Sequence, residues 1–221
     1  MENKLSKAET LTSEQFIKEK DFWMSKLSGE LVRSSFQYDS VINIDDGIKD
    51  DEIKFEFDNS TFSKLIKLSN GSDLRLYMIF VTAITIMVYK YTDIDDVILG
   101  APICKQEVEG NFINTILALR NKVKEKSTFK DVLLAVRQTL VESTENQNYP
   151  IEKLLYQLDL TYSGKGFPLF DIVVMLQNIH SKEYIENVKT NIMFSFVNHG
   201  DRVEGVIEYN SSVYEKSTIE R

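Results

Sequence analysis

One segment constrains the fold more than any other, because from about Asp73 to Tyr91 nearly every side chain is apolar. We predict a helix here, separated by Asn70-Gly71 from a shorter helix before it. A helix that is apolar nearly all round must be enclosed by other elements. Its longest apolar run, Leu76–Tyr89, is interrupted by Thr82 and Thr85 and is too short to span a bilayer. We therefore expect a central core helix and no membrane partner.

The composition predicts a soluble chain with one core of ordinary size. Of its 221 residues, 43% are hydrophobic and 11% are aromatic, which is enough apolar surface to offset chain entropy. The net charge is −8 and the cations form no stripe, so we expect no nucleic-acid partner. The polar N-terminus has no apolar segment of the signal-peptide kind. Cys104 is the single cysteine, so we expect a cytoplasmic, reducing location without disulfides.

The N-terminal part of the chain predicts one helix followed by a loop. Thr12-Ser13-Glu14-Gln15 has the pattern of a capping box, and apolar residues then recur at helical spacing until Gly29. From Glu30 to Asp51 the periodicity is lost and acidic residues gather, which indicates a solvated connector and not a metal site. The members of this acidic group are Asp45, Asp46, Asp50 and Asp51, with Gly47 among them.

The remaining segments alternate between strands and amphipathic helices. Thr128 opens one predicted helix, and Pro150 stands in the first turn of the next. Residues 198–201 join the last two strands as a hairpin, and a new helix near Val213–Ser217 makes the C-terminus resemble a cut. The predicted strands are Ile53–Phe57, Val97–Ile103, Ile113–Val123, Phe170–Leu176, Ile192–Val197 and Val203–Tyr209. This order predicts an α/β (α+β) sandwich, a mixed sheet with helices packed on one face.

No residue pattern in the sequence indicates a catalytic site. His199 falls in the predicted hairpin turn and His180 at a strand end, so we interpret both as structural or exposed. Neither belongs to a pair with metal-ligand spacing, so no zinc site is expected. Ser163-Gly164-Lys165-Gly166 superficially resembles a phosphate loop, but it lacks the upstream glycine and the following helix. Composition and spacing alone therefore define an α/β domain without a visible catalytic group, with Cys104 interpreted as a buried thiol.

Three segments, in this order, resemble the later signature motifs of condensation domains from nonribosomal peptide synthetases. Residues 111–120 are similar to the family's Gly-x-Phe-Val-Asn-Thr-x-x-x-Arg, and residues 146–154 to its Gln-Asp-Tyr-Pro-Phe-Glu. Residues 167–178 contain the proline, apolar strand and Gln-Asn of a third motif. Residues 21–29 resemble Tyr-Trp-x-x-x-Leu-x-Gly. The order and spacing of these matches cover nearly the whole chain.

This resemblance implies a fold like chloramphenicol acetyltransferase, in which two lobes face each other across a tunnel. Carrier proteins would deliver phosphopantetheine-bound thioesters from both sides, and the acceptor amine would attack the donor thioester to form an amide. The family's His-His-x-x-x-Asp-Gly motif belongs to the N-terminal lobe, and this chain has no adjacent histidine pair. The resemblance therefore implies half of a two-lobe fold, with residues 1–51 as first helix and inter-lobe linker and residues 52–221 as the C-terminal lobe.

The resemblance also implies roles for eight motif residues, which we interpret as structural or tunnel-lining. An Asn-Thr pair can fix strand geometry, an arginine can pair with an acid, and a glutamate suits the first turn of a helix. The eight are Asn114, Thr115, Arg120, Tyr149, Pro150, Glu152, Gln177 and Asn178. We expect no catalytic residue, metal or bound cofactor in this chain. The expected partners are the missing N-terminal lobe, peptidyl carrier proteins and an adjoining adenylation domain.

Two alternatives remain open. The chain could be a stand-alone interaction module that binds a carrier protein or a synthetase subunit without chemistry. It could also be an intact acyltransferase of related fold, an alternative weakened by the complete lack of the histidine motif. Local departures from the family pattern are Ile103-Cys104-Lys105 in place of Ala-Gly-Arg, a shortened connection to Gly110, Ile151 in place of Phe, and Asn148 in place of Asp.

Overall fold

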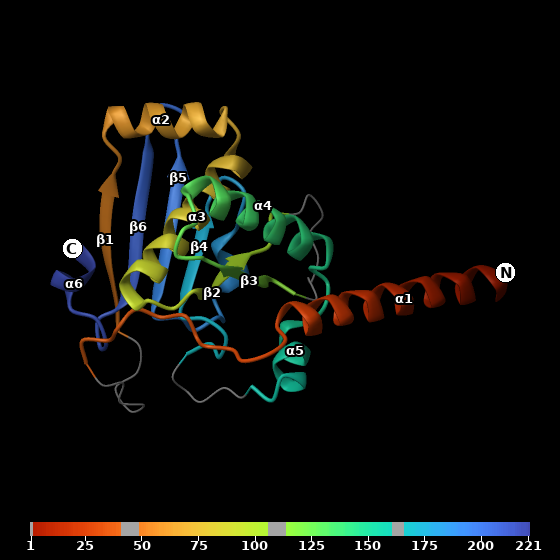
Figure 1. Ribbon diagram of the computed structural model, residues 1–221. Coiled ribbons are helices and arrows are strands. Elements are labelled where there is room, and N and C mark those ends of the chain that lie inside the picture. Colours follow the sequence, from red (N-terminus) through yellow and green to blue (C-terminus); the bar gives the residue numbers. More distant parts are fainter. Residues whose placement is uncertain (1, 41–48, 106–113, 161–165) are drawn as a thin grey trace.

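A six-stranded mixed sheet with the order β1-β6-β5-β4-β2-β3 organises the protein (Figure 1). The computed structural model describes residues 2–40, 49–105, 114–160 and 166–221, with the side chains of the first helix from residue 14 on. The strands are β1 (Asp50–Glu56), β2 (Asp96–Pro102), β3 (Ile116–Lys122), β4 (Ile172–Leu176), β5 (Ile192–Asn198) and β6 (Val203–Asn210). β4 runs parallel to both β2 and β5, and the other pairs are antiparallel.

Helices α3 (Asp73–Thr92) and α4 (Phe129–Glu145) cover one face of this sheet (Figure 1). α3 contacts β2 and β4, α4 contacts β3, and the two helices pack on each other. α2 (Asn59–Ser69) packs on α3 and ends at Asn70, whose left-handed backbone has φ 50°. The predicted mixed sheet with helices on one face is confirmed.

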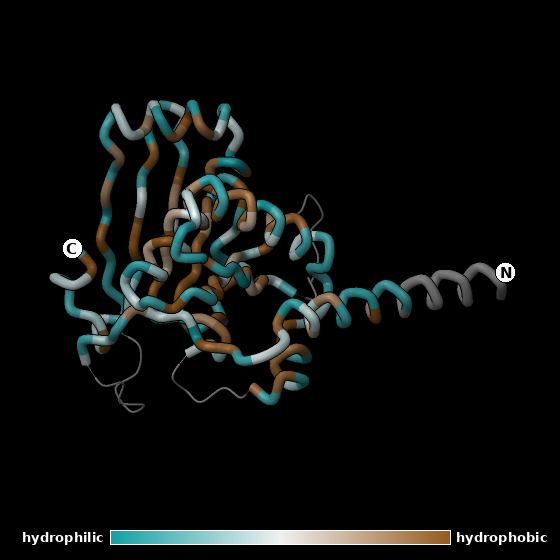
Figure 2. The backbone as a smooth tube through the Cα atoms, in the orientation of Figure 1, coloured by the Kyte–Doolittle hydropathy of each residue, from teal (hydrophilic) through white to brown (hydrophobic). Residues whose placement is uncertain are grey.

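α3 is the central core helix that the sequence predicts. Ten of its side chains, from Leu76 to Val88, are buried. By length and composition alone α3 could cross a membrane, and no other described helix could, but half of its apolar window is buried inside the fold. In Figure 2 the hydrophobic residues run through the sheet and through α3, whereas the described part of α1 is mainly hydrophilic. The burial of α3 is therefore explained by the sheet and by its helical neighbours.

The shorter helices lie at the margins of the sheet. α1 (Glu2–Lys26) projects from the body, and α5 (Ile151–Gln157) packs beside its C-terminal half (Figure 1). The 3₁₀ helix η2 (Lys182–Ile185) contacts β2. α6 (Lys216–Glu220) follows β6 and begins within the range where the sequence predicts a new helix.

The start of the first helix was predicted wrongly. α1 begins at Glu2, so Thr12 and Ser13 lie inside it and do not cap it. The preceding residues are mostly Lys, Glu, Leu and Ala, which favour helix and extend it past the capping pattern. Pro150 is likewise displaced by one position, because it is the residue before the helix and Ile151 is the first helical residue. Thr128, in contrast, forms a complete capping box with Asp131.

The acidic connector is shorter than predicted. Asp50 and Asp51 belong to β1, where they pair with Asn210 and Tyr209. The Tyr209 hydroxyl donates to Asp51 Oδ2 at 2.9 Å, so these carboxylates fit an exposed edge strand. Asp45, Asp46 and Gly47 lie outside the described residues, as do Ile113, Ser163, Gly164 and Lys165.

Candidate functional site

Arg120 joins the outer edge of the sheet to the end of α1. On β3, its Nε and Nη2 donate to the two carboxylate oxygens of Asp96 on β2, at 2.9 and 2.6 Å. Its remaining donors reach three backbone carbonyls at the C-terminal end of α1 and just beyond it, and these belong to Lys26 (3.3 Å), Ser28 (2.6 Å) and Glu30 (3.1 Å). The planar guanidinium therefore satisfies a carboxylate and a helix C-terminus at once.

The charges of this pair favour a permanent ion pair. The hydrogen bond to Asp96 raises the pKa of Arg120. Burial raises the pKa of Asp96, but the hydrogen bonds and charge of Arg120 outweigh burial and hold that pKa below its usual range. Neither group can exchange a proton near neutral pH. The geometry thus favours the structural interpretation of Arg120.

The second motif lies in the turn between α4 and α5, and Asn114 of the first motif binds this turn. Asn114 is buried, donates to the Gln147 carbonyl at 3.1 Å, and accepts from the Ile116 amide at 3.4 Å. The Tyr149 hydroxyl donates to Gln157 Oε1 at 3.0 Å. No side-chain hydrogen bond to a described residue is found for the other three motif members. The Thr115 backbone carbonyl accepts from the Ile103 amide at 3.0 Å. Pro150 precedes α5, and Glu152 is exposed in its first turn.

Gln177 and Asn178 fix the turn after β4. Gln177 Nε2 donates to Ser195 Oγ at 2.8 Å. Asn178 donates to the Asn198 carbonyl and accepts from its amide, both at 2.8 Å. The Asn198 side chain continues to Asp73 Oδ1 at the start of α3, also at 2.8 Å. Within the described residues no hydrogen bond or ion pair links this turn to Arg120 or Asn114, so the predicted site residues fall into separate groups.

His180, Cys104 and His199 are the residues of the types that most often act as base or nucleophile, and they have different environments. His180 is buried, its Nδ1 accepts from the Leu176 amide at 3.1 Å, and its ring lies 4.4 Å from that of Tyr77. Burial lowers the pKa of His180 to about 4. Burial also raises the pKa of the Cys104 thiol, which keeps it protonated. His199 lies 3.2 Å from Glu204 at the surface of the hairpin.

A buried carboxylate network was missed in the sequence. Asp171 is fully buried and accepts from the Arg33 guanidinium, from the Tyr38 hydroxyl at 2.9 Å and from Asn191 Nδ2 at 2.9 Å. Burial raises the pKa of Asp171, and burial together with Asp171 raises the pKa of Tyr38 to about 12. Asp171 stands inside the third motif, but Arg33 and Tyr38 lie in the aperiodic connector, where no local pattern marks them.

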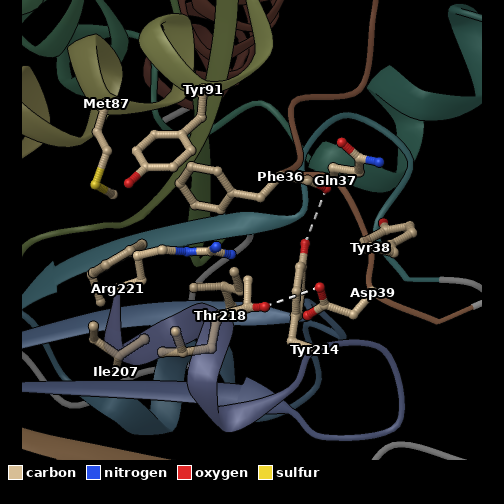
Figure 3. Close-up of a pocket in the computed structure, with 13 residues that line it drawn as sticks. Phe36, Gln37, Tyr38, Asp39, Met87, Tyr91, Ile207, Tyr214, Thr218 and Arg221 are labelled. Atoms are coloured by element: carbon tan, nitrogen blue, oxygen red, sulfur yellow. Dashed lines mark hydrogen bonds between the residues drawn. The ribbon is translucent and has the colours of Figure 1, made fainter.

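An apolar pocket of about 490 Å³ lies beside α6 (Figure 3). Met87 and Tyr91 of α3 stand on one side, and Ile207 of β6 lies on the other side. The Tyr214 hydroxyl donates to the Phe36 carbonyl at 3.3 Å across the rim. None of the eight predicted site residues lines this pocket. Asp39 and Arg221 add two ionisable side chains to this mainly apolar lining, and none of the described lining residues is a histidine, cysteine or lysine.

The architecture and the comparisons define the class of protein. A mixed α/β sheet of this kind is half of the chloramphenicol-acetyltransferase-like fold, and the structure matches solved chains of that class over 97–99% of its length. The sequence model described as "Condensation domain" matches residues 5–221. The chain therefore belongs to the condensation-domain family.

Relatives within this family are large synthetases. The chain is 29% identical to bacitracin synthase 3 of Bacillus licheniformis over 92% of its own length and 4% of that protein. It is 25% identical to tyrocidine synthase 3 of Brevibacillus parabrevis over 97% of its length and 4% of the relative. The chain thus spans a small part of the curated relatives it matches.

Solved structures share the fold at lower identity. The X-domain in the complex of the X-domain and OxyB from teicoplanin biosynthesis matches with a TM-score of 0.79 and 16% identity, over 99% of this chain and 53% of that one. The starter condensation domain of rhizomide synthetase matches with a TM-score of 0.70 and 14% identity, over 97% and 51%. This chain spans about half of each of these chains.

Proposed function

We propose that this chain supplies the C-terminal lobe and one tunnel wall of a nonribosomal peptide synthetase condensation domain, and that it is not catalytic alone. The complete domain would form an amide bond between two carrier-bound thioesters. The observation that carries the proposal is the state of the histidines: the chain has two, they are not adjacent, and the buried His180 already uses Nδ1 as an acceptor. The motif residues then serve to hold the lobe in shape.

The half-length match supports a second lobe as partner. A lobe that faces another lobe across a tunnel needs a fixed sheet edge, and Arg120 fixes the edge next to α1. The thioesters would arrive on phosphopantetheine arms of peptidyl carrier proteins, so this chain itself would bind no cofactor covalently. A solved structural neighbour is a four domain nonribosomal peptide synthetase bound to AMP and glycine, which supports an adjoining adenylation domain as partner. A cytoplasmic location is part of the same proposal.

The test is reconstitution. We expect the purified chain alone to give no amide product from carrier-bound substrates, because no positioned base is available. Adding a separately expressed N-terminal lobe that carries the His-His-x-x-x-Asp-Gly motif should restore product, change the elution volume and raise the melting temperature by linkage. His180→Ala and His199→Ala serve as controls that should not affect reconstituted turnover in folded protein. Product from the chain alone that is lost in either variant would overturn the proposal.

A second candidate is a non-catalytic interaction module. One observation favours it: a structural neighbour is the X-domain of teicoplanin biosynthesis, and that protein was solved as a complex with OxyB. The reconstitution experiment separates the two candidates. An interaction module would bind a carrier protein or a synthetase subunit with the same affinity whether or not an N-terminal lobe is present, and it would never support product formation.

A further inference from the structure

Glu19 is a buried carboxylate whose charge is not balanced within the described residues. It lies on α1, is 1% exposed, and forms no ion pair with any described side chain. Its Oε1 accepts from Gln15 Nε2 at 2.7 Å and more weakly from Asn148 Nδ2 at 3.5 Å. Its Oε2 is buried and has no hydrogen-bond partner among the described residues. A buried oxygen without a hydrogen-bond partner destabilises a fold, so a ligand that contacts Oε2 would stabilise this one.

The turn that faces Glu19 adds two more acceptors without donors. The buried Asn146 Oδ1 and Gln147 Oε1 also lack hydrogen-bond partners in the described part of the chain. The orientation of the Asn146 amide is fixed, because its Nδ2 donates to the Glu142 carbonyl at 2.8 Å. Exchanging the oxygen and nitrogen of this amide would place two acceptors face to face.

Two hydrogen bonds place Glu19 and the turn that carries the other two oxygens next to each other. Trp23, one helical turn after Glu19, donates to the Asn146 carbonyl at 2.7 Å. Asn148 reaches Glu19 itself. The turn 146–148 therefore runs along the face of α1 that carries Glu19 and Trp23. The Phe16 and Tyr149 rings, with centroids 4.9 Å apart, pack beside this junction.

We propose that Glu19, Asn146 and Gln147 form a binding site for a monovalent metal cation, which holds α1 to the turn before α5. The donor set consists of oxygen atoms only, which suits hard cations. A single carboxylate with two neutral amide oxygens matches one positive charge, whereas calcium sites recruit several carboxylates. Two lysines have described contacts near this side: Lys26 is bound to Glu142 at 3.2 Å, and Lys153 Nζ lies 5.1 Å from the centroid of the Phe16 ring. Neither forms an ion pair with Glu19 in the described part of the chain. The inference does not depend on the proposed function.

The first test measures thermal stability of the full chain in about 0.1 M potassium, sodium or choline chloride, an ionic strength at which surface charges are already screened. Choline has the same charge but is too large for an enclosed site. We expect a melting temperature roughly 3–5 °C higher in one of the metal salts, as for a cation present at about ten times its dissociation constant. Glu19→Gln should remove this difference. Its new amide can also donate to the unpaired oxygens, so the variant should be no less stable than the parent in choline.

Glu14→Gln is the matched control, because Glu14 lies exposed on the same helix and the same charge is removed. This variant should keep the full dependence on the metal cation. If Glu19→Gln does not fold, anomalous diffraction from crystals soaked in rubidium or thallium salts decides, with a peak expected at Glu19 Oε2. Equal melting temperatures of the parent in all three salts, stabilisation by calcium or magnesium only, or no anomalous peak at Glu19 would each overturn the proposal. Equal melting temperatures would point to a protonated carboxyl or an enclosed water.

Discussion

The two ends of the sheet are held together by different physics. At the β1–β6–β5 end the contacts are aromatic: the Phe80 and Phe196 rings stack at 3.9 Å between centroids, and Phe57 stacks on both. At the β2–β3 end the strands are also buried in the apolar core, but a polar network is added at the edge, where Arg120 binds Asp96 and the carbonyls at the end of α1. We refer to these as the aromatic end and the polar end.

The difference matters because apolar burial and hydrogen bonding respond differently to substitution. Aromatic burial is nondirectional and can repack within limits, so the aromatic end supplies free energy of folding. A bidentate arginine with three further carbonyl bonds has one good geometry, so the polar end supplies position. If the chain is one lobe of a two-lobe domain, as we propose, a fixed geometry at this edge would orient it toward the other lobe.

The largest expected effect breaks the aromatic end. Phe196→Ala should lower the free energy of unfolding by about 4 kcal/mol, since a buried ring 4% exposed is lost from the stack. Urea unfolding measures this loss. Tyr156→Ala is the control for losing an aromatic ring, because Tyr156 is 83% exposed and its removal should change stability by less than about 0.5 kcal/mol. Similar losses in the two variants would contradict a stability role specific to the stack.

The next effect tests the polar end. Arg120→Ala should cost roughly 2–3 kcal/mol, because it removes the donor of three carbonyls and leaves Asp96 with only the exposed Lys122, 3.5 Å away. Arg120→Lys should recover only part of this, since an ammonium cannot replace the fork geometry. Arg202→Ala is the matched control: its side chain is 41% exposed and pairs with Glu204, so the loss should stay below about 1 kcal/mol.

The same arginine also tests function. In a complete domain, Arg120→Ala should lower turnover in proportion to the loss of folded protein or of lobe association. If turnover disappeared while melting temperature and carrier binding stayed unchanged, the positional role of Arg120 would be wrong and a direct catalytic role would replace it.

A third prediction concerns His180, which follows β4 in the middle of the sheet. Its pKa is about 4 in the fold against about 6.5 when unfolded, so the unfolded chain binds a proton first as pH falls. The stability contributed by neutral His180 is present above pH 6.5 and is lost between about 6.5 and 4. The free energy of unfolding should therefore fall by roughly 2 kcal/mol more for the parent than for His180→Asn between about pH 7 and pH 5.

His180→Asn suits this test because an amide oxygen can accept from the Leu176 amide without titrating. Comparing the two proteins also cancels the opposite contribution of Asp171, whose pKa is raised by burial. Parallel pH profiles for parent and variant would show that His180 is not the titrating group.

The sequence predicts the aromatic end better than the polar end, for a physical reason. Alternation in residues 192–197 and 203–209 and the turn between them are local signals, so the β5–β6 hairpin is found. Likewise the apolar run of α3 and the Thr128 cap are read from neighbouring residues. These signals need no knowledge of distant partners.

The polar contacts lack such signals. Arg33 meets Asp171 across 138 positions, and Arg120 meets the carbonyls of residues 26–30 across 90–94 positions. A carbonyl has no sequence signature at all, so the partners of Arg120 could be proposed only as "an acid". Glu19 resembles any helical surface charge until the turn 146–148 is folded against it. The motif resemblance selects candidate residues but does not say which groups they contact.

The smallest expected effect on stability concerns Glu152, a motif residue that lies at neither the aromatic end nor the polar end. Glu152 is exposed in the first turn of α5 and makes no capping bond, so Glu152→Gln should cost no more than about 0.5 kcal/mol through the lost helix-dipole interaction. That loss should fade at high salt, where surface charges are screened. Glu183→Gln, in the first turn of η2, provides a second exposed glutamate for comparison. If Glu152→Gln instead left stability unchanged but weakened association with the other lobe or with a carrier protein at least tenfold, Glu152 would be a contact residue and its motif would describe an interface. An exposed carboxylate that has no hydrogen bond or ion pair among the described residues is available to such a partner.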